Sequence, residues 1–136
     1  MAYVIERKER IQDEVVFRGG GKELHLTVDM DIDSATKNYW KQYETLCIAR
    51  EKLQKEPNSE EKQRAFGTAA MALVAFIFGE EQAVKLLEFY EQREGEMLTD
   101  VLPYLCDEVY PRLKKASEQR IKSVSGFKNR ISKWRR

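Results

Sequence analysis

The hydrophobic period of this chain changes once along its length, and that change limits the folds open to it. Leu24, Leu26 and Val28 alternate with polar residues, which is the two-residue period of a half-buried β-strand. From about Asp33 onward, the apolar residues recur at the spacing of one helix face. We therefore expect a mainly α protein: an N-terminal β-hairpin, a compact bundle of about four helices, and a C-terminal tail.

The hairpin is expected over residues 14–29. Val15, Val16 and Phe17 supply a short β-prone run, and Gly19–Gly21 supplies residues that tolerate positive φ in a tight turn. A glycine run can also cradle a phosphate, but the P-loop needs a helix to follow, and here Lys22 leads into a strand. Tyr3–Arg10 is either a third strand or a short helix.

Four helices are expected after the hairpin. Asp33 or Ser34 can cap the first, and Asn58 with Glu61 three residues later suits the start of the second, which Gly79 would stop. The second helix contains a stretch that is apolar around almost its whole circumference, so it should be buried on all sides, in the core or against another subunit. That stretch is Phe66–Phe78.

The third helix is expected over Glu80–Gln92, with Gly95 marking its end. Apolar residues then recur every four positions from Met97, the core stripe of a last helix. Pro103 and Pro111 interrupt this stripe, which predicts a late start, a kink or a helix broken in two.

Charge is unevenly distributed between the body and the C-terminus. Residues 114–136 hold nine Lys or Arg and one acid, a net charge of +8, whereas the other 113 residues carry a net charge of −7. Blocks of like charge at a terminus are typical of interaction segments. We expect a single domain over residues 1–116 and a basic, flexible tail over residues 117–136.

The usual groups for catalysis and metal binding are sparse. His25 is the one histidine and falls on the polar face of a strand, and it forms no zinc spacing with Cys47 and Cys106. The acidic run Asp29–Asp33 lacks the glycine and the final glutamate of a calcium loop, so it is interpreted as a strand-to-helix connection. We expect no enzyme activity, no metal and no cofactor, two free thiols, and a soluble chain without a membrane span.

The order of these segments resembles a known family. The loop Phe17–Lys22 continues into a strand at Glu23–Val28, a tyrosine-rich helix follows, and then comes the segment Phe78–Glu91 (FGEEQAVKLLEFYE). A last helix with a late proline, Met97–Arg112, precedes the basic tail. Over roughly residues 14–130 the chain resembles the tail assembly chaperones of long-tailed, non-contractile bacteriophages and related prophages.

The resemblance implies a role in virion assembly without enzyme activity. Members bind the tape measure protein, a long and aggregation-prone helical chain, and keep it soluble until tail tube subunits displace them. Members can self-associate, and some have a longer form that recruits the tube protein. The resemblance also implies a location in the host bacterial cytoplasm and absence from the mature virion.

Two sets of residues are candidates for binding such a partner. Apolar side chains of the body could cover helical stripes of the partner: Phe66, Met71, Phe76, Phe78 and Met97. Aromatic, aliphatic and basic side chains alternate in the tail: Phe127, Lys128, Arg130, Ile131, Lys133, Trp134, Arg135 and Arg136. The alternative is a small nucleic-acid-binding regulatory protein that uses this tail on phosphates.

Overall fold

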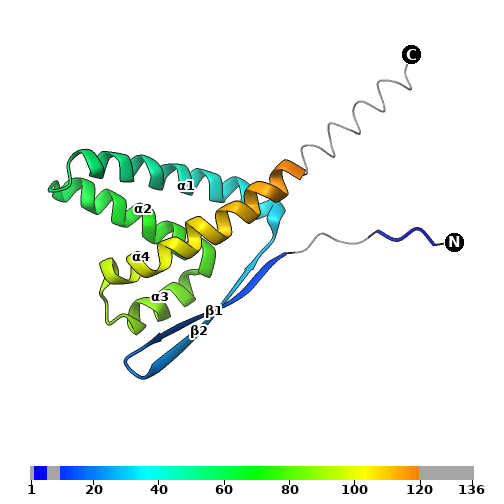
Figure 1. Cartoon of the computed structure of the whole chain (residues 1–136), viewed down its shortest axis with the longest axis horizontal. Coiled ribbons are helices and arrows are strands. Elements are labelled where there is room, and N and C mark those ends of the chain that lie inside the picture. Colours follow the sequence, from blue (N-terminus) through cyan, green and yellow to red (C-terminus); the bar gives the residue numbers. More distant parts are fainter. Residues whose placement is uncertain (1, 6–9, 120–136) are drawn as a thin grey trace, which may run out of the picture.

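The computed structural model describes residues 2–5 and 10–119 and contains one β-hairpin followed by four helices (Figure 1). The mainly α class with an N-terminal hairpin is therefore confirmed. The strands are β1 (Ile11–Gly19) and β2 (Lys22–Met30), and the helices are α1 (Ile32–Lys55), α2 (Glu60–Phe78), α3 (Glu80–Phe89) and α4 (Glu94–Pro103). The π-helical segment η1 (Tyr104–Val109) continues α4, and residues 110–119 are again α-helical.

The hairpin is longer than expected but has the expected turn. Its strands pair antiparallel without a bulge, from Ile11 opposite Met30 to Gly19 opposite Lys22. Gly20 and Gly21 form the turn at φ 56° and 75°, values that suit glycine. The segment that could have been a third strand or a helix is neither at residues 2–5 and 10, and its other residues lie outside those described.

The helices pack on one face of the hairpin. In Figure 1, α1 and α2 lie antiparallel, the long helical path through α4 and η1 crosses them, and α3 lies near the hairpin. One core joins these elements, because nearly every one of them contributes a side chain that is less than 2% exposed. Among these are Leu26, Tyr39, Leu73, Leu86, Met97, Leu105 and Leu113. Among the described residues, no helix combines the length and apolar character needed to cross a bilayer.

The first two helices begin at other residues than the sequence predicted. α1 begins at Ile32, so Asp33 and Ser34 lie inside its first turn rather than directly before it. Ser59 caps α2, not Asn58, and its hydroxyl oxygen lies 3.4 Å from the Lys62 amide nitrogen that donates to it.

The expected end of α2 is confirmed. Gly79 has a φ of 85°, and its N–H donates to the carbonyl oxygen of Ala75 at 2.8 Å. Its positive φ suits a residue without Cβ, which closes α2 and starts α3 at the next residue.

The predicted end of α3 is wrong. The helix stops at Phe89, and Glu91 and Gln92 follow at φ 55° and 65°. Gly95 is the second residue of α4 and stops nothing. Tertiary contacts hold this turn: the Tyr90 hydroxyl donates to Asp100 at 2.8 Å, which joins the end of α3 to α4.

The last helix absorbs both prolines in one continuous helical path. Pro103 has no N–H for the carbonyl of Thr99, and the path widens into the π turns of η1 directly after it. Pro111 lies in the α-helical residues 110–119. Residues 117–119 of the predicted tail therefore belong to this helix, and residues 120–136 lie outside those described.

Candidate partner-binding groove

An apolar groove of about 300 Å³ lies where α1, α2 and α4 meet. Leu46 and Leu98 are buried at its base, and half-buried Phe66 and Leu102 contribute apolar surface. A void of this size takes one or two large side chains, and its apolar lining favours aliphatic or aromatic ones. Among the described residues, the lining consists of Tyr43, Leu46, Cys47, Arg50, Phe66, Leu98, Thr99, Leu102, Pro103 and Cys106.

The switch from α to π geometry shapes one wall of this groove. Thr99, Leu102 and Pro103 line it just before the π segment, and Cys106 lines it from within that segment. Where the helix widens, its side chains leave the register that an unbroken α-helix would have given them. Short π segments are frequent at functional sites.

An aromatic cluster fixes the position of η1 against α1. The Tyr39 hydroxyl donates to the carbonyl oxygen of Leu105 at 2.9 Å in the core. The rings of Tyr43 and Tyr110 lie 4.6 Å apart, and Trp40 packs edge-on against Tyr110 at 5.1 Å. Burial raises the pKa of Tyr43, which borders the groove, to about 12.

One cation borders the groove. Arg50 is exposed and has no ion pair or hydrogen bond with any described residue. Burial raises the pKa of the Cys106 thiol, with the nearby Asp107 acting in the same direction and Arg50 opposing them. An apolar groove with a free guanidinium on its edge suits a helix that carries a large apolar side chain and a nearby carboxylate.

The structure separates the five predicted binding residues of the body. Phe78 and Met97 are 4% and 0% exposed in the core, so neither presents a surface. Phe66 lines the groove, while Met71 and Phe76 are half-buried and do not line it. Five residues along an α-helix rotate a side chain by about 140°, so Met71 lies far around the helix from both Phe66 and Phe76, whereas Phe66 and Phe76, ten residues apart, differ by about 80°.

The expectation that the apolar stretch of α2 is buried on all sides is wrong for the single chain. Thr68 and Ala72 are exposed, and Ala75 beside them is half-buried. The opposite side of α2, which includes Leu73, Val74 and Ile77, packs in the core.

The binding residues predicted in the tail lie outside the described residues. They are Phe127, Lys128, Arg130, Ile131, Lys133, Trp134, Arg135 and Arg136.

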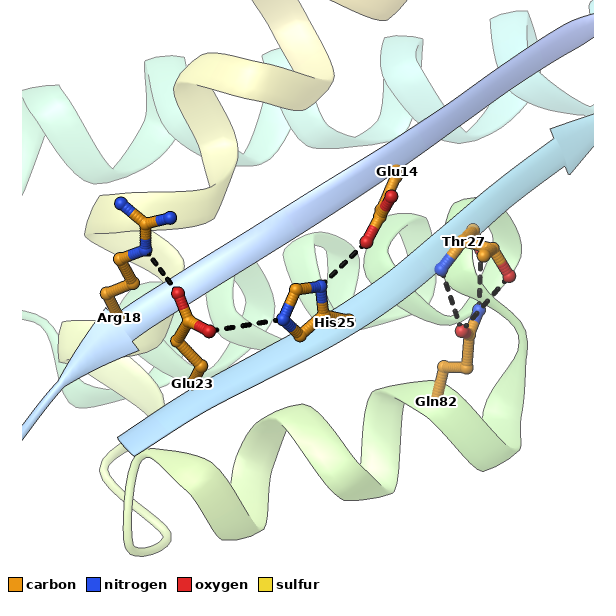
Figure 2. Close-up of polar contacts among 6 residues, drawn as sticks. All are labelled: Glu14, Arg18, Glu23, His25, Thr27 and Gln82. Atoms are coloured by element: carbon orange, nitrogen blue, oxygen red, sulfur yellow. Dashed lines mark hydrogen bonds and ion pairs between the residues drawn. The ribbon is translucent and has the colours of Figure 1, made fainter. Parts of the chain in front are cut away.

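The polar face of the hairpin holds a chain of charged side chains (Figure 2). Both imidazole nitrogens of His25 face carboxylates: Nδ1 lies 2.6 Å from Glu14 and Nε2 lies 3.3 Å from Glu23. Glu23 also accepts a hydrogen bond from Arg18 at 2.6 Å. Hydrogen bonds to Glu14 and Glu23 raise the pKa of His25. The placement of His25 on the polar face is confirmed.

The acidic run after β2 connects a strand to a helix, as interpreted from the sequence. Asp29 is the second-last residue of β2, where it accepts a hydrogen bond from Arg10 at 2.7 Å, and Asp31 precedes the first residue of α1. Within the described ranges, no three His, Cys, Asp or Glu side chains come together in a way that could hold a metal ion. Cys47 and Cys106 are free cysteines on the groove wall.

Comparison of the chain with protein-family models, curated proteins and solved structures finds no match. The assignment of the groove as a candidate binding site therefore depends on its geometry alone. Sequence reasoning found Phe66 but missed the rest of the groove, whose lining residues come from four segments between Tyr43 and Cys106. The one available signal was Pro103 within an otherwise regular apolar stripe.

Proposed function

We propose that this protein is a non-enzymatic tail assembly chaperone of a long-tailed bacteriophage or prophage. It binds the tape measure protein in the host cytoplasm, keeps it soluble, and is absent from the mature virion. A longer form would recruit the tail tube protein. The observation that carries the proposal is the open apolar groove bordered by Arg50.

The chemistry of the groove supports a helical, apolar partner. A long helix that awaits assembly exposes a stripe of large apolar side chains, and a groove of about 300 Å³ has room for one or two of them. A single flanking cation adds attraction that salt weakens, so the complex can be released when a stronger partner arrives. The absence of an ion pair on Arg50 within the described chain leaves this guanidinium free for such a partner.

Co-expression with the tape measure protein tests the proposal. Wild-type chain should keep the tape measure protein soluble and co-purify with it. Leu102→Lys places an ammonium group in the groove, and we expect most of the soluble complex to be lost. The matched control is Ile48→Lys on α1, where an apolar side chain that is 46% exposed lies outside the groove lining.

The outcomes distinguish binding through the groove from binding elsewhere and from the nucleic-acid alternative. Loss with Leu102→Lys but not with Ile48→Lys, while both variants keep a native circular dichroism spectrum, supports binding through the groove. Equal co-purification of both variants would remove the groove from the proposal. If the tape measure protein stays insoluble beside the wild-type chain, and nucleic acid co-purifies instead, the regulatory alternative is favoured.

A further inference from the structure

The two edges of the hairpin differ in a way that points to a partner. On the outer edge of β2, the Gln82 amide binds both main-chain groups of Thr27: its Oε1 accepts from the Thr27 N–H at 2.9 Å, and its Nε2 donates to the Thr27 carbonyl at 2.7 Å. Figure 2 shows α3 running along this side of β2, away from β1. The outer edge of β2 is therefore occupied by the chain itself.

The outer edge of β1 has no such cover among the described residues. Because the main-chain groups of Thr27 point away from β1, those of its partner Glu14 point away from β2, as do those of every second residue along the strand. Gln12, Glu14, Val16 and Arg18 thus direct their N–H and C=O groups outward, and no described residue bonds to them. β1 has charged side chains but no proline, no lysine and no bulge, which are three of the devices that block edge pairing.

We propose that the outer edge of β1 pairs antiparallel with β1 of a second copy of this chain. The pattern of side chains along β1 is complementary to itself in one register, with Val16 opposite Val16 of the second copy. Glu14 then lies opposite Arg18 of the second copy, twice by symmetry. Val16 is 38% exposed in the single chain, and the pairing would cover it.

The same register matches the other face of the strand. There, half-buried Val15 meets Phe17 of the second copy, so the apolar inner faces continue across the junction. Shifting the register by two residues per strand brings Glu14 opposite Glu14, a like-charge contact that opposes pairing. Of these two registers, the charges favour the one that places Val16 opposite Val16.

The proposed assembly is closed. Within the described part of the chain, each hairpin has one uncovered edge, so two copies use up both edges and form a four-stranded sheet with β2 on each outside. The Gln82 clamp and α3 then prevent further strands from adding, and the sheet stops at two copies. This inference rests on the strand edges and is independent of the proposed chaperone function.

Charge reversal tests the register. Glu14→Arg and Arg18→Glu each replace two opposite-charge pairs by like-charge pairs, and we expect each variant alone to associate about tenfold more weakly or worse than the wild type. A mixture of the two variants restores opposite charges at both positions, so it should associate as the wild type does. Analytical ultracentrifugation of each variant and of the mixture measures this. A mixture no tighter than its components would overturn the register.

Two strand variants test the surface. Val16 lies on the symmetry axis at a hydrogen-bonded pair, where Cα atoms are about 5.5 Å apart, so Val16→Cys should form a disulfide-linked dimer under mild oxidation. Val84→Cys on α3, 57% exposed, is the control and should cross-link far more slowly. Val16→Pro removes only an outward N–H and should give a monomer with an unchanged circular dichroism spectrum. A wild-type monomer at all concentrations, or a folded Val16→Pro variant that stays dimeric, would overturn the proposal.

Discussion

The side chain of Gln82 pairs with the main chain of Thr27 as a neighbouring strand would (Figure 2). Its amide offers one acceptor and one donor, which match the N–H and C=O of a single strand residue. The same Nε2 also donates to the carbonyl of Phe78 at 2.6 Å, so the clamp joins β2 to the end of α2. An isolated two-stranded hairpin is marginal in water, and this contact helps to hold it on the helices.

Replacing Gln82 should loosen the hairpin. Gln82→Ala leaves the main-chain groups of Thr27 to water, and we expect a loss of about 1–2 kcal/mol in the free energy of unfolding. Urea denaturation measures this, and hydrogen exchange at the Thr27 amide should accelerate at the same time. Glu81→Ala, an exposed neighbour on α3, is the matched control. Equal stability of the two variants would contradict the clamp.

Local signals in the sequence were sufficient for the hairpin and for the end of α2. Gly20 and Gly21 lie between two β-prone runs, and Gly79 directly follows a long apolar stretch. In each case a residue without Cβ stands where the chain needs positive φ, so the backbone requirement is visible in the residue type. The start of α2 was missed by one position because Asn58 and Ser59 are both good caps.

The end of α3 and the groove depend on contacts that no local pattern reveals. Glu91 and Gln92 adopt positive φ although neither residue type favours it, and the Tyr90 to Asp100 hydrogen bond across the turn holds them there. Pro103 predicted an irregularity in the last helix. The structure shows a π segment after Pro103 and no break, and the Tyr39 hydroxyl donates a hydrogen bond to Leu105 within this segment. The groove is formed by residues far apart in the chain, so only the assembled fold shows it.

The Tyr39 hydroxyl is expected to stabilise the π segment. Tyr39→Phe removes the donor and leaves the buried carbonyl of Leu105 without this partner, which should cost about 1–3 kcal/mol. Tyr110→Phe makes the same chemical change in the same aromatic cluster, where the hydroxyl makes no hydrogen bond to any described residue, and should have little effect. Thermal unfolding of both variants tests the difference. A larger loss in Tyr110→Phe would show that the hydroxyl of Tyr39 is not the important one.

Asp13 should make the protein sensitive to acid. Burial would raise the pKa of Asp13, but hydrogen bonds from Tyr104 at 2.6 Å and Arg112 at 2.7 Å outweigh it, and the net pKa lies below the ordinary value. A carboxyl whose folded pKa is lowered stabilises the fold above its unfolded pKa of about 4, and this contribution fades as the pH falls through the folded pKa.

The substitution Asp13→Asn tests this linkage. The variant should be less stable than the wild type near neutral pH, and the gap should narrow as the pH falls below about 4. Urea denaturation across this pH range measures the gap. Asp100→Asn, which alters the acceptor of Tyr90 instead, controls for the loss of one hydrogen-bonded carboxylate. A gap that stays constant with pH would contradict the role of Asp13.

The pKa of His25 should report on the row of charged side chains on the polar face of the hairpin. It is the one histidine in the sequence, so its ring resonances need no assignment by mutation. Hydrogen bonds to Glu14 and then Glu23 raise its pKa above the ordinary 6.5. The protonated ring therefore stabilises the hairpin below about pH 6.5, and this contribution is lost as the pH rises through the folded pKa. A proton NMR titration should give a midpoint above 6.5.

Glu14→Gln removes the closer of the two carboxylates and should lower the His25 midpoint more than Glu23→Gln does, because Glu14 lies 2.6 Å from the ring and Glu23 lies 3.3 Å from it. Glu80→Gln on α3 is the control for a change in net charge and should leave the midpoint in place. Pairing of β1 with a second copy would bring Arg18 of that copy to Glu14 and draw the carboxylate away from His25. The midpoint should then fall as the protein concentration rises, and a midpoint independent of concentration in a dimerising sample would place the contact elsewhere.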